Sequence, residues 1–384
     1  MLYRKYRPQQ FGDVVGQEHV VRTLLGALAS GRVGHAYLFA GPRGTGKTTI
    51  ARIFAKALNC ADFSKIREAN LGQKSSIRDQ QGRDLNIQNI PCNKCAACLA
   101  VNNGNSLDLI EIDGASNGRV DEIRELKGSA TVAAMSGGYK TFLIDEVHMV
   151  STSGFNALLK ILEEPPAHVM FLLATTDPHK IPSTVLSRVQ RFDFKKLTPK
   201  QIVAKLASIA KSEKIKIDDE ALATIALSAD GAIRDAEVML TKVLSFVGEG
   251  EKITIERIQE ILGLIPHTYH PQFFGYLVSR DRQAAMTFIQ KLNDSGGNLE
   301  HFSRDFLAYL RTLLVAKVSP ATLAAAGQDF STAHIEQLSQ LSASLDNQAL
   351  IRMILLFTNA RQEMKFSPIP QLPLELAVIE LTNS

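Results

Sequence analysis

The chain has 384 residues, of which 45% are hydrophobic, and its formal net charge is only +4. This length predicts two or three domains, and so weak a charge gives no argument by itself for a nucleic-acid binder. No apolar run is long enough to cross a membrane, and the first residues (MLYRKYRP) lack the apolar stretch of a signal peptide, so we expect a cytoplasmic protein.

A glycine-rich segment at 41–48 (GPRGTGKT) has the pattern G-x-x-x-x-G-K-[ST] of a phosphate-binding loop. An apolar strand is predicted before it at 36–40 and an amphipathic helix after it at 49–58, which makes a chance glycine turn a weak alternative. Lys47 is expected to reach the β- and γ-phosphates and Thr48 to hold Mg²⁺. The residues expected to bind the nucleotide are Gly41, Gly44, Thr45, Gly46, Lys47, Thr48 and Thr49.

Residues 61–91 are rich in polar side chains and show little periodicity, which predicts a solvent-exposed and partly disordered insertion. The four cysteines of the chain flank it: Cys60, Cys92, Cys95 and Cys98. In a reducing cytoplasm this spacing indicates a metal rather than disulfides, and four thiolates would close a tetrahedral structural zinc site. An iron–sulfur cluster and free thiols are the alternatives, and Cys60 is the least certain ligand because the insertion separates it from the others.

Further strands are predicted at 107–112, 140–144, 169–174 and 191–194, with a helix at 153–162. This alternation is typical of a parallel α/β sheet. Asp145 and Glu146 directly follow one of the strands. We interpret Asp145 as the carboxylate on the metal side and Glu146 as the catalytic carboxylate that orients and polarises an attacking water. A charged pair that merely caps the strand is the alternative.

Beyond Leu197 the pattern becomes entirely helical. Thr198 followed by Pro199 is a favourable helix start, with a capping side chain and then a proline. A linker is predicted at 266–271. The predicted helices are 199–213, 218–229, 231–247, 254–262, 271–279, 281–293, 297–317, 333–343, 346–364 and 371–382.

Together these motifs resemble one family, the gamma/tau subunits of the bacterial DNA polymerase III clamp loader, which are AAA+ ATPases. The segments that carry the resemblance are YRP (6–8), VVGQE (14–18), the glycine loop, NC (59–60) with the cysteine run, DLIEID (108–113), LIDEVH (143–148), FNALLK (155–160), LEEPP (162–166), ATTDP (174–178), LSR (186–188) and GAIRDA (231–236). The resemblance implies an AAA+ α/β core with an inserted zinc module at 1–197, a helical lid at 198–265 and an all-α oligomerisation (collar) domain at 266–384.

The resemblance also implies roles for single residues. Arg188 would be the arginine finger that reaches a neighbouring subunit's γ-phosphate, Thr176 the first sensor and Arg234 the second sensor on the lid. Surface salt bridges are the alternative for both arginines. The residues implied to line the adenine pocket are Tyr6, Arg7, Pro8, Val14 and Val15. The chain departs from the family at Val189, where a cysteine is usual, and in its long insertion at 61–91.

By the same resemblance, DNA phosphates would contact Asn117, Arg119 and Arg124, at a helix start that Ser116 or Asn117 can cap. A helix N-terminus with two guanidinium groups is a reasonable phosphate site. The alternative is a solvated helix start whose arginines pair with the neighbouring acids Asp121, Glu122 and Glu125.

The function implied is that of an ATP-driven motor that loads the sliding clamp onto primed DNA and does not itself polymerise DNA. Its partners would be delta, delta-prime and further gamma/tau copies in a hetero-pentamer. The main alternative is a non-hydrolysing scaffold like delta-prime, but the glycine loop is degenerate in that relative and intact here. An archaeal or eukaryotic small subunit would lack the cysteine module. Three alternatives stay open for its length: the short gamma form, an engineered fragment of a longer chain, or a lineage without the tau extension.

Overall fold

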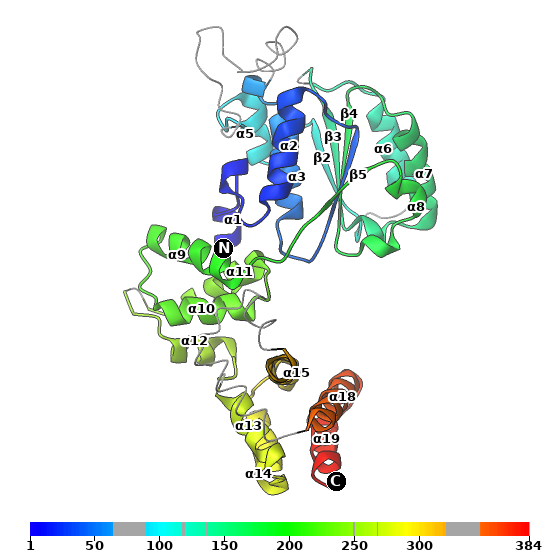
Figure 1. Cartoon of the computed structure of the whole chain (residues 1–384). Helices are drawn as coiled ribbons and strands as arrows, with labels where there is room; N and C mark the ends of the chain where they lie inside the picture. The colour runs from blue at the N-terminus through cyan, green and yellow to red at the C-terminus, as the bar shows by residue number, and fades with distance from the viewer. Residues whose placement is uncertain are drawn as a thin grey trace. The chain divides into compact units, whose positions relative to one another are not determined.

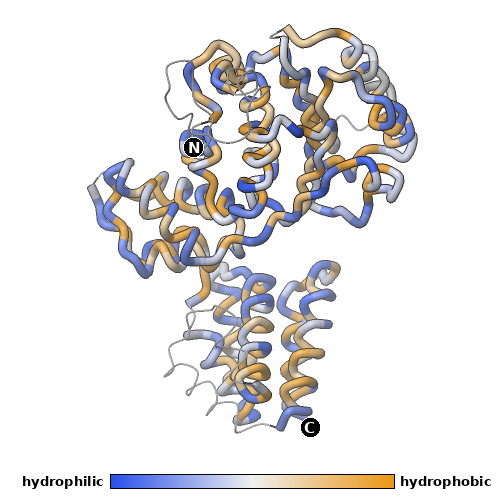
Figure 2. Tube along the Cα trace, turned by 45° about the horizontal axis from the view of Figure 1, so that its top comes forward, coloured by the Kyte–Doolittle hydropathy of each residue, from blue (hydrophilic) through white to orange (hydrophobic). Residues whose placement is uncertain are grey.

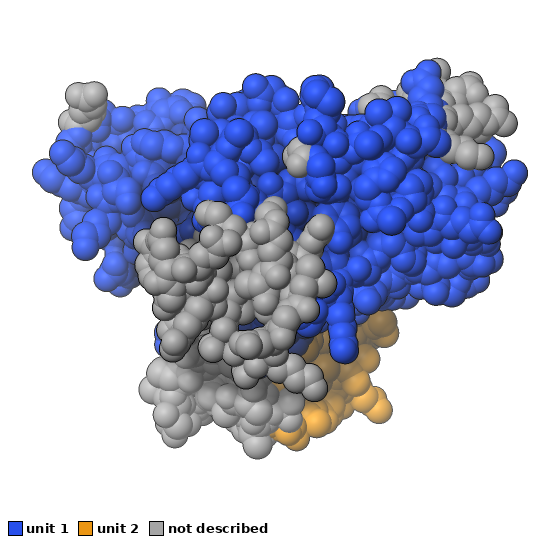
Figure 3. Space-filling view, turned by 90° about the horizontal axis from the view of Figure 1, so that it is seen from above, with its two compact units in different colours: residues 1–254 blue, residues 255–384 orange. Residues whose placement is uncertain are grey.

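The computed structural model describes residues 1–63, 90–116, 120–135, 137–248, 250–266, 268–319 and 346–383. The chain divides into two compact units, Met1–Thr254 and Ile255–Ser384 (Figure 3). Residues 64–89 of the predicted insertion and the whole predicted helix at 333–343 lie outside the described residues.

A parallel sheet forms the centre of the first unit (Figure 1). Among the described residues its strands are β1 (Ala36–Ala40), β2 (Leu109–Asp113), β3 (Lys140–Asp145), β4 (Val169–Thr175) and β5 (Gln190–Asp193), in the order β2-β3-β4-β1-β5. Strands β1 and β4 are buried along their whole length, as expected of parallel strands covered on both faces. The predicted strands and the predicted α/β class are confirmed.

Helices cover both faces of this sheet (Figure 1). Successive side chains of a strand point to opposite faces. Tyr37 and Phe39 of β1 therefore pack with α2 (Glu18–Ser30) and α3 (Lys47–Leu58). Ala36 and Leu38 pack instead with α6 (Val120–Ala130) and α7 (Thr152–Glu163), and α7 confirms the helix predicted at 153–162.

The carboxyl ends of the parallel strands lie at one edge of the sheet. Ala40 at the end of β1 pairs with Thr175 at the end of β4, and Asp113 of β2 pairs with Asp145 of β3. The glycine loop, the acid pair and the two threonines at the end of β4, Thr175 and Thr176, therefore emerge together. This is the edge at which open α/β sheets bind ligands.

Three more helices of the described first unit follow the sheet: α9 (Pro199–Ser212), α10 (Asp219–Ser228) and α11 (Ile233–Leu244). Thr198 caps α9 as predicted, because its hydroxyl accepts a hydrogen bond from the backbone N–H of Gln201. The N-terminal helix α1 (Leu2–Lys5) packs against α11, and the backbone N–H of Leu2 donates to Thr241 Oγ1 at 3.3 Å. The N-terminal segment is thereby attached to this helical part.

The second unit is helical throughout its described residues. Its helices are α12 (Ile255–Leu262), α13 (Tyr269–Val278), α14 (Arg282–Asp294), α15 (Leu299–Val318), α18 (Asn347–Met364) and α19 (Leu372–Thr382). These match the helices predicted for this part of the chain, apart from the one at 333–343. Figure 2 shows hydrophobic and hydrophilic residues interspersed over the helical part of the chain.

Phenylalanine rings make up much of the core of this second unit. The ring of Phe273 lies 5.2 Å from Phe288, 5.3 Å from Phe302 and 5.1 Å from Phe306, measured between centroids. Phe357 of α18 lies 5.0 Å from Phe306. Each such ring pair stabilises the fold by about 0.5–1.5 kcal/mol beyond the contribution of its buried area.

Throughout the described residues, the helices are too short or too polar for any of them to span a membrane.

Candidate nucleotide site and metal centre

The glycine loop connects the end of β1 to the start of α3. Gly41 and Gly44 have φ angles of 147° and 76°, which favour glycine. A Cβ atom at Gly41 would lie 2.6 Å from the carbonyl oxygen of Phe194, and one at Gly44 would lie 2.8 Å from the Cβ of Ala232. The loop is therefore confined between the segment after β5 and the start of α11, with no room for a side chain at either glycine.

Lys47 begins α3 and its side chain folds back over the loop. Its Nζ donates hydrogen bonds of 2.8 Å to the carbonyl oxygens of Gly41 and Pro42. Burial lowers the pKa of Lys47, and the carboxylates of Glu146 and Asp145 act in the opposite direction. The ammonium group is thus held over the loop and within the field of the acid pair.

The acid pair lies directly against the first turn of α3. Thr48 Oγ1 donates to Asp145 Oδ2 at 2.8 Å, so the hydroxyl and carboxylate predicted to hold Mg²⁺ lie side by side. A hydroxyl and a carboxylate at the mouth of a phosphate loop are oxygen ligands of the kind that Mg²⁺ uses beside a nucleotide. These residues therefore fit a magnesium–nucleotide complex.

Glu146 has an unusual backbone conformation, with φ 45° and ψ 46°, in the left-handed region that non-glycine residues seldom adopt. Its Oε2 accepts hydrogen bonds from Thr176 Oγ1 at 2.8 Å and from the Thr176 backbone N–H at 3.2 Å. His148 Nδ1 lies 3.4 Å from the same oxygen and 3.0 Å from Thr175 Oγ1. The structure therefore brings Thr176 to Glu146, together with His148 and Thr175, which the sequence analysis did not single out.

The N-terminal residues predicted for the adenine pocket lie on either side of the short helix η1 (Phe11–Asp13). Arg7 Nε donates to Thr49 Oγ1 at 3.2 Å, and burial lowers the pKa of Arg7. Tyr6 instead directs its hydroxyl to Glu213 at the end of α9, at 2.6 Å. Pro8, Val14 and Val15 are half-buried.

Arg234 lies in the first turn of α11. Its guanidinium carbon is 5.1 Å from the ring centroid of Tyr3, within the range of a cation–π contact. The residue just before this helix, Ala232, is the one that packs against Gly44 of the loop. Arg234 therefore lies on an element that directly contacts the loop, whereas Tyr3 carried no signal in the sequence analysis.

Arg188 lies where the strands of the sheet begin, at the end opposite the glycine loop. It lines an open cavity of about 690 Å³ with residues at the beginnings of β1 and β5, including Ala36 and Gln190. The five residues of β1, at about 3.3 Å each, place roughly 16 Å between this edge and the glycine loop. Arg188 Nη2 is 2.7 Å from Glu163 Oε1 at the end of α7. It is thus not brought to the loop of its own chain.

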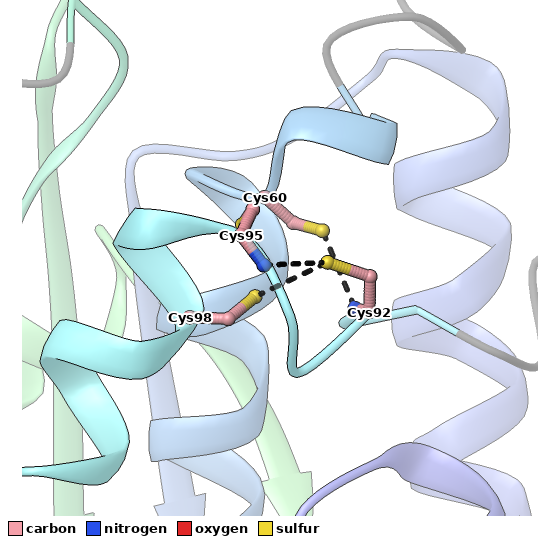
Figure 4. Close-up of side chains that lie close together, drawn as sticks. All are labelled: Cys60, Cys92, Cys95 and Cys98. Atoms are coloured by element: carbon pink, nitrogen blue, oxygen red, sulfur yellow. Dashed lines mark hydrogen bonds between the residues drawn. The ribbon is translucent and has the colours of Figure 1, made fainter.

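The four cysteines converge although the insertion separates Cys60 from the other three (Figure 4). Their Sγ atoms all lie within 4.8 Å of one another, and Cys92 Sγ is 3.9 Å from Cys98 Sγ. A tetrahedral site with metal–sulfur bonds of about 2.3 Å requires sulfur atoms about 3.8 Å apart, whereas a disulfide requires about 2.05 Å. The cluster therefore fits a tetrahedral metal ion.

Backbone amides support these sulfur atoms. The N–H of Cys92 donates to Cys60 Sγ at 3.3 Å, and the N–H of Cys95 donates to Cys92 Sγ at 3.4 Å. The hydrogen bond with Cys98 lowers the pKa of Cys60 to about 5. The same bond raises the pKa of Cys98, and burial raises that of Cys92, so Cys60 is the favoured thiolate, the form that binds metal.

The predicted DNA contacts fall outside the part of the chain that the structure describes. Asn117 and Arg119 lie outside the described residues, and so does the side chain of Arg124, although its backbone belongs to α6. The strand that precedes them ends in a defined turn, where Ser116 Oγ donates to Asp113 Oδ2 at 3.0 Å.

Comparisons with known proteins identify the family. A family model described as the DNA polymerase III delta subunit matches residues 16–87 and 75–198. A model described as the clamp loader subunit ATPase lid domain matches residues 201–248. A model described as domain III of DNA polymerase III subunits gamma and tau matches residues 253–384. A DNA polymerase III subunit gamma of Buchnera aphidicola is 34% identical over 384 residues, which cover 100% of this chain and 99% of that protein. This chain belongs to the DNA polymerase III gamma/tau family.

Two longer gamma/tau relatives match over the same region. The subunit tau of Bacillus subtilis is 40% identical over 383 residues, which cover 100% of this chain and 63% of that protein. The subunit tau of Escherichia coli is 36% identical over 381 residues, covering 99% of this chain and 54% of the relative. The chain thus spans about three fifths of these relatives, and the family resemblance seen in its motifs is confirmed.

Proposed function

We propose that this gamma/tau chain is an ATP-hydrolysing motor subunit of the clamp loader, which places sliding clamps on primed DNA in the cytoplasm. The observation that carries the proposal is the contact between the glycine loop and the acid pair, where Thr48 Oγ1 donates to Asp145 Oδ2 at 2.8 Å. The names of its relatives as DNA polymerase III subunits, and of one matching model as a clamp-loader ATPase lid, support the assembly.

In this proposal the loop binds the triphosphate of ATP through its backbone amides and through Lys47. Mg²⁺, when bound, neutralises charge on the phosphate oxygens, and Thr48 and Asp145 would hold it. Glu146 orients and polarises the attacking water. Thr176 positions Glu146 through the two hydrogen bonds that it donates to the carboxylate.

The arginines act on two different nucleotides. Arg188, at the edge of the sheet away from its own loop, reaches the nucleotide of a neighbouring subunit. Arg234 on α11 contacts the nucleotide of its own chain, since its helix abuts Gly44. The adenine ring lies near Tyr6–Pro8, Val14 and Val15. The helices at 198–265 form the lid over this nucleotide.

The partners in this proposal are those of a clamp loader. The helical domain at 266–384 forms the collar that joins delta, delta-prime and further gamma/tau copies into a hetero-pentamer. Asn117, Arg119 and Arg124 contact the phosphates of primed DNA. The chain drives loading and leaves DNA synthesis to another subunit.

Hydrolysis by the assembled loader tests this function. The full chain, assembled with the other loader subunits, is expected to hydrolyse ATP faster when clamp and primed DNA are both present, because loading consumes ATP. Phosphate release measures the rate, and unprimed single-stranded DNA is the control substrate. A rate that ignores both clamp and primed DNA, or a chain that does not bind ATP, would contradict the proposal.

We also propose that the four cysteines hold one structural Zn²⁺. The cluster offers four soft thiolate ligands in tetrahedral spacing, and Cys60 and Cys98 are fully buried. Four protein ligands leave no open position on the metal for a substrate, as is typical of structural zinc sites. Zinc in such a site stabilises the fold because metal-binding energy contributes to folding energy.

Cys95→Ser is expected to lose most of the bound zinc and to destabilise the first unit. A loss of about 3 kcal/mol would lower its melting temperature by roughly 10 °C. Elemental analysis and thermal unfolding measure the two effects. Ala96→Ser, at an exposed neighbouring position, is the matched control. Iron in place of zinc, or a full zinc content in Cys95→Ser, would refute the assignment.

A further inference from the structure

Lys56, in the last turn of α3, is a buried cation beside the cysteine cluster. Only 2% of its surface is exposed. Its Nζ donates hydrogen bonds to Gln9 Oε1 at 3.0 Å, Asn93 Oδ1 at 2.6 Å and Asn102 Oδ1 at 2.7 Å. All three donors of the ammonium group are thus used by neutral amide oxygens.

These three partners come from three different segments. Asn93 lies in the turn between Cys92 and Cys95 and has a φ of 57°. Asn102 ends α5 (Ala96–Asn102), the helix that carries Cys98. Gln9 lies in the N-terminal segment directly after Tyr6–Pro8. A single side chain therefore connects the segment of Cys92, Cys95 and Cys98 with the segment assigned to the adenine pocket.

The charges at this point are complementary. Burial of a cation among neutral groups is costly unless an opposite charge lies near. Four thiolates around a divalent ion carry a net charge of about −2, which would attract the ammonium group of Lys56. Burial lowers the pKa of Lys56, and the Cys98 thiol and Asp13, which ends η1, act in the opposite direction.

The opposite end of the same helix lies in the nucleotide site. Helix α3 runs from Lys47 to Leu58, so Lys47 and Lys56 belong to one continuous helix of 12 residues. Ligand-induced movement of α3 or of the N-terminal segment would therefore act on the hydrogen bonds of Lys56. A change in the cysteine module would act on the same bonds from the other side.

We propose that Lys56 is a positioning residue that couples metal occupancy of the cysteine module to nucleotide binding, through its bonds to Asn93 and Asn102 on one side and Gln9 on the other. This inference rests on the proposed function. Coupling between two binding sites is reciprocal, so bound zinc strengthens ATP binding and bound ATP retains zinc by the same factor. Couplings of this kind amount to about fivefold or more.

The coupling is tested by the rate at which the zinc-loaded full chain loses its zinc to a chromophoric chelator. Saturating ATP, with Mg²⁺ in excess, is expected to slow this transfer in the wild type by about fivefold. In Gln9→Leu the ratio of the rates without and with ATP should fall toward one, because the link to the N-terminal segment is lost. Gln9→Glu keeps an oxygen acceptor and should restore the wild-type ratio. Gln9 is exposed, so both variants are expected to fold.

A second pair of variants tests Lys56 itself. Lys56→Met should lower zinc affinity by about 10–100-fold, as the loss of a supporting partner of a metal site does. Lys94→Met, which removes the same charge from an exposed position in the same cysteine turn, should leave zinc affinity and the ATP ratio unchanged. Lys56→Met should also bring the ratio of the rates without and with ATP toward one. If Lys56 had a purely structural role, this variant would change both transfer rates equally and keep the wild-type ratio.

Two results would overturn the inference while leaving the proposed function in place. One is a wild-type ratio of one in a chain whose ATP binding is shown by fluorescence titration. The other is a Gln9→Leu ratio equal to that of the wild type. A chain that binds no ATP at all would overturn the proposed function and this inference with it.

Discussion

Glu146→Gln is expected to bind ATP normally and to hydrolyse it about 10²–10⁴-fold more slowly, the range associated with loss of a positioned acid or base. Binding depends on the backbone amides of the glycine loop and on Lys47 rather than on the Glu146 carboxylate. The amide keeps a hydrogen-bond acceptor for Thr176 but cannot take a proton from water. Nucleotide titration and single-turnover hydrolysis measure the two effects separately.

Two comparisons make this result specific. Lys47→Ala should lose ATP binding itself, because its ammonium group is the cation held over the loop. Glu164→Gln, an identical substitution at an exposed position after α7, should behave as the wild type. Near-normal turnover in Glu146→Gln would remove this residue from the mechanism.

Arg188→Ala is expected to lower hydrolysis by the assembled loader by about 10³–10⁵-fold at the site that its finger serves. Nucleotide affinity of the isolated chain should hardly change, since Arg188 lies at the edge of the sheet away from its own loop. Its ion pair with Glu163 is partly exposed, and such pairs contribute only about 0–1 kcal/mol. The guanidinium group can therefore leave Glu163 for a phosphate at little cost.

Mixed assemblies distinguish action on a neighbour from action within the chain. A subunit with Arg188→Ala should inactivate the site next to it while its own site still works when its neighbour is wild type. Arg191→Ala is the matched control, because Arg191 is an exposed arginine of β5 that pairs with Asp193. If Arg188→Ala subunits support full turnover at the neighbouring site, the finger is another residue.

The strands and helices could be predicted from local sequence patterns, because a buried strand requires a run of apolar residues and a helix start favours a capping residue. The buried strand at 36–40 and the start of α9 at Thr198 and Pro199 were predicted at the residues where the structure has them. The convergence of Cys60 with the other cysteines was predicted with less support, since an insertion separates them in sequence. The chemistry of thiols, rather than their spacing, made that prediction possible.

No local sequence pattern indicated the contacts between residues that are distant in the chain. The bonds of Lys56 join residues 37 to 47 positions apart, and nothing in the periodicity of α3 distinguishes this lysine from a solvated one. His148 reaches Thr175 across two strand ends, which requires the pairing of β3 with β4. The location of Arg188 at the far edge likewise depends on the direction of β5. Such features become visible only once the strand order is known.

The left-handed backbone of Glu146 sets stability against activity at this position. A glutamate in that conformation costs about 1–3 kcal/mol that glycine would not, which agrees with the catalytic role that we propose for its carboxylate. Selection for thermal tolerance alone would therefore enrich glycine or asparagine at position 146 and discard the carboxylate. Engineering a heat-resistant form of this subunit would need a functional screen beside the thermal one.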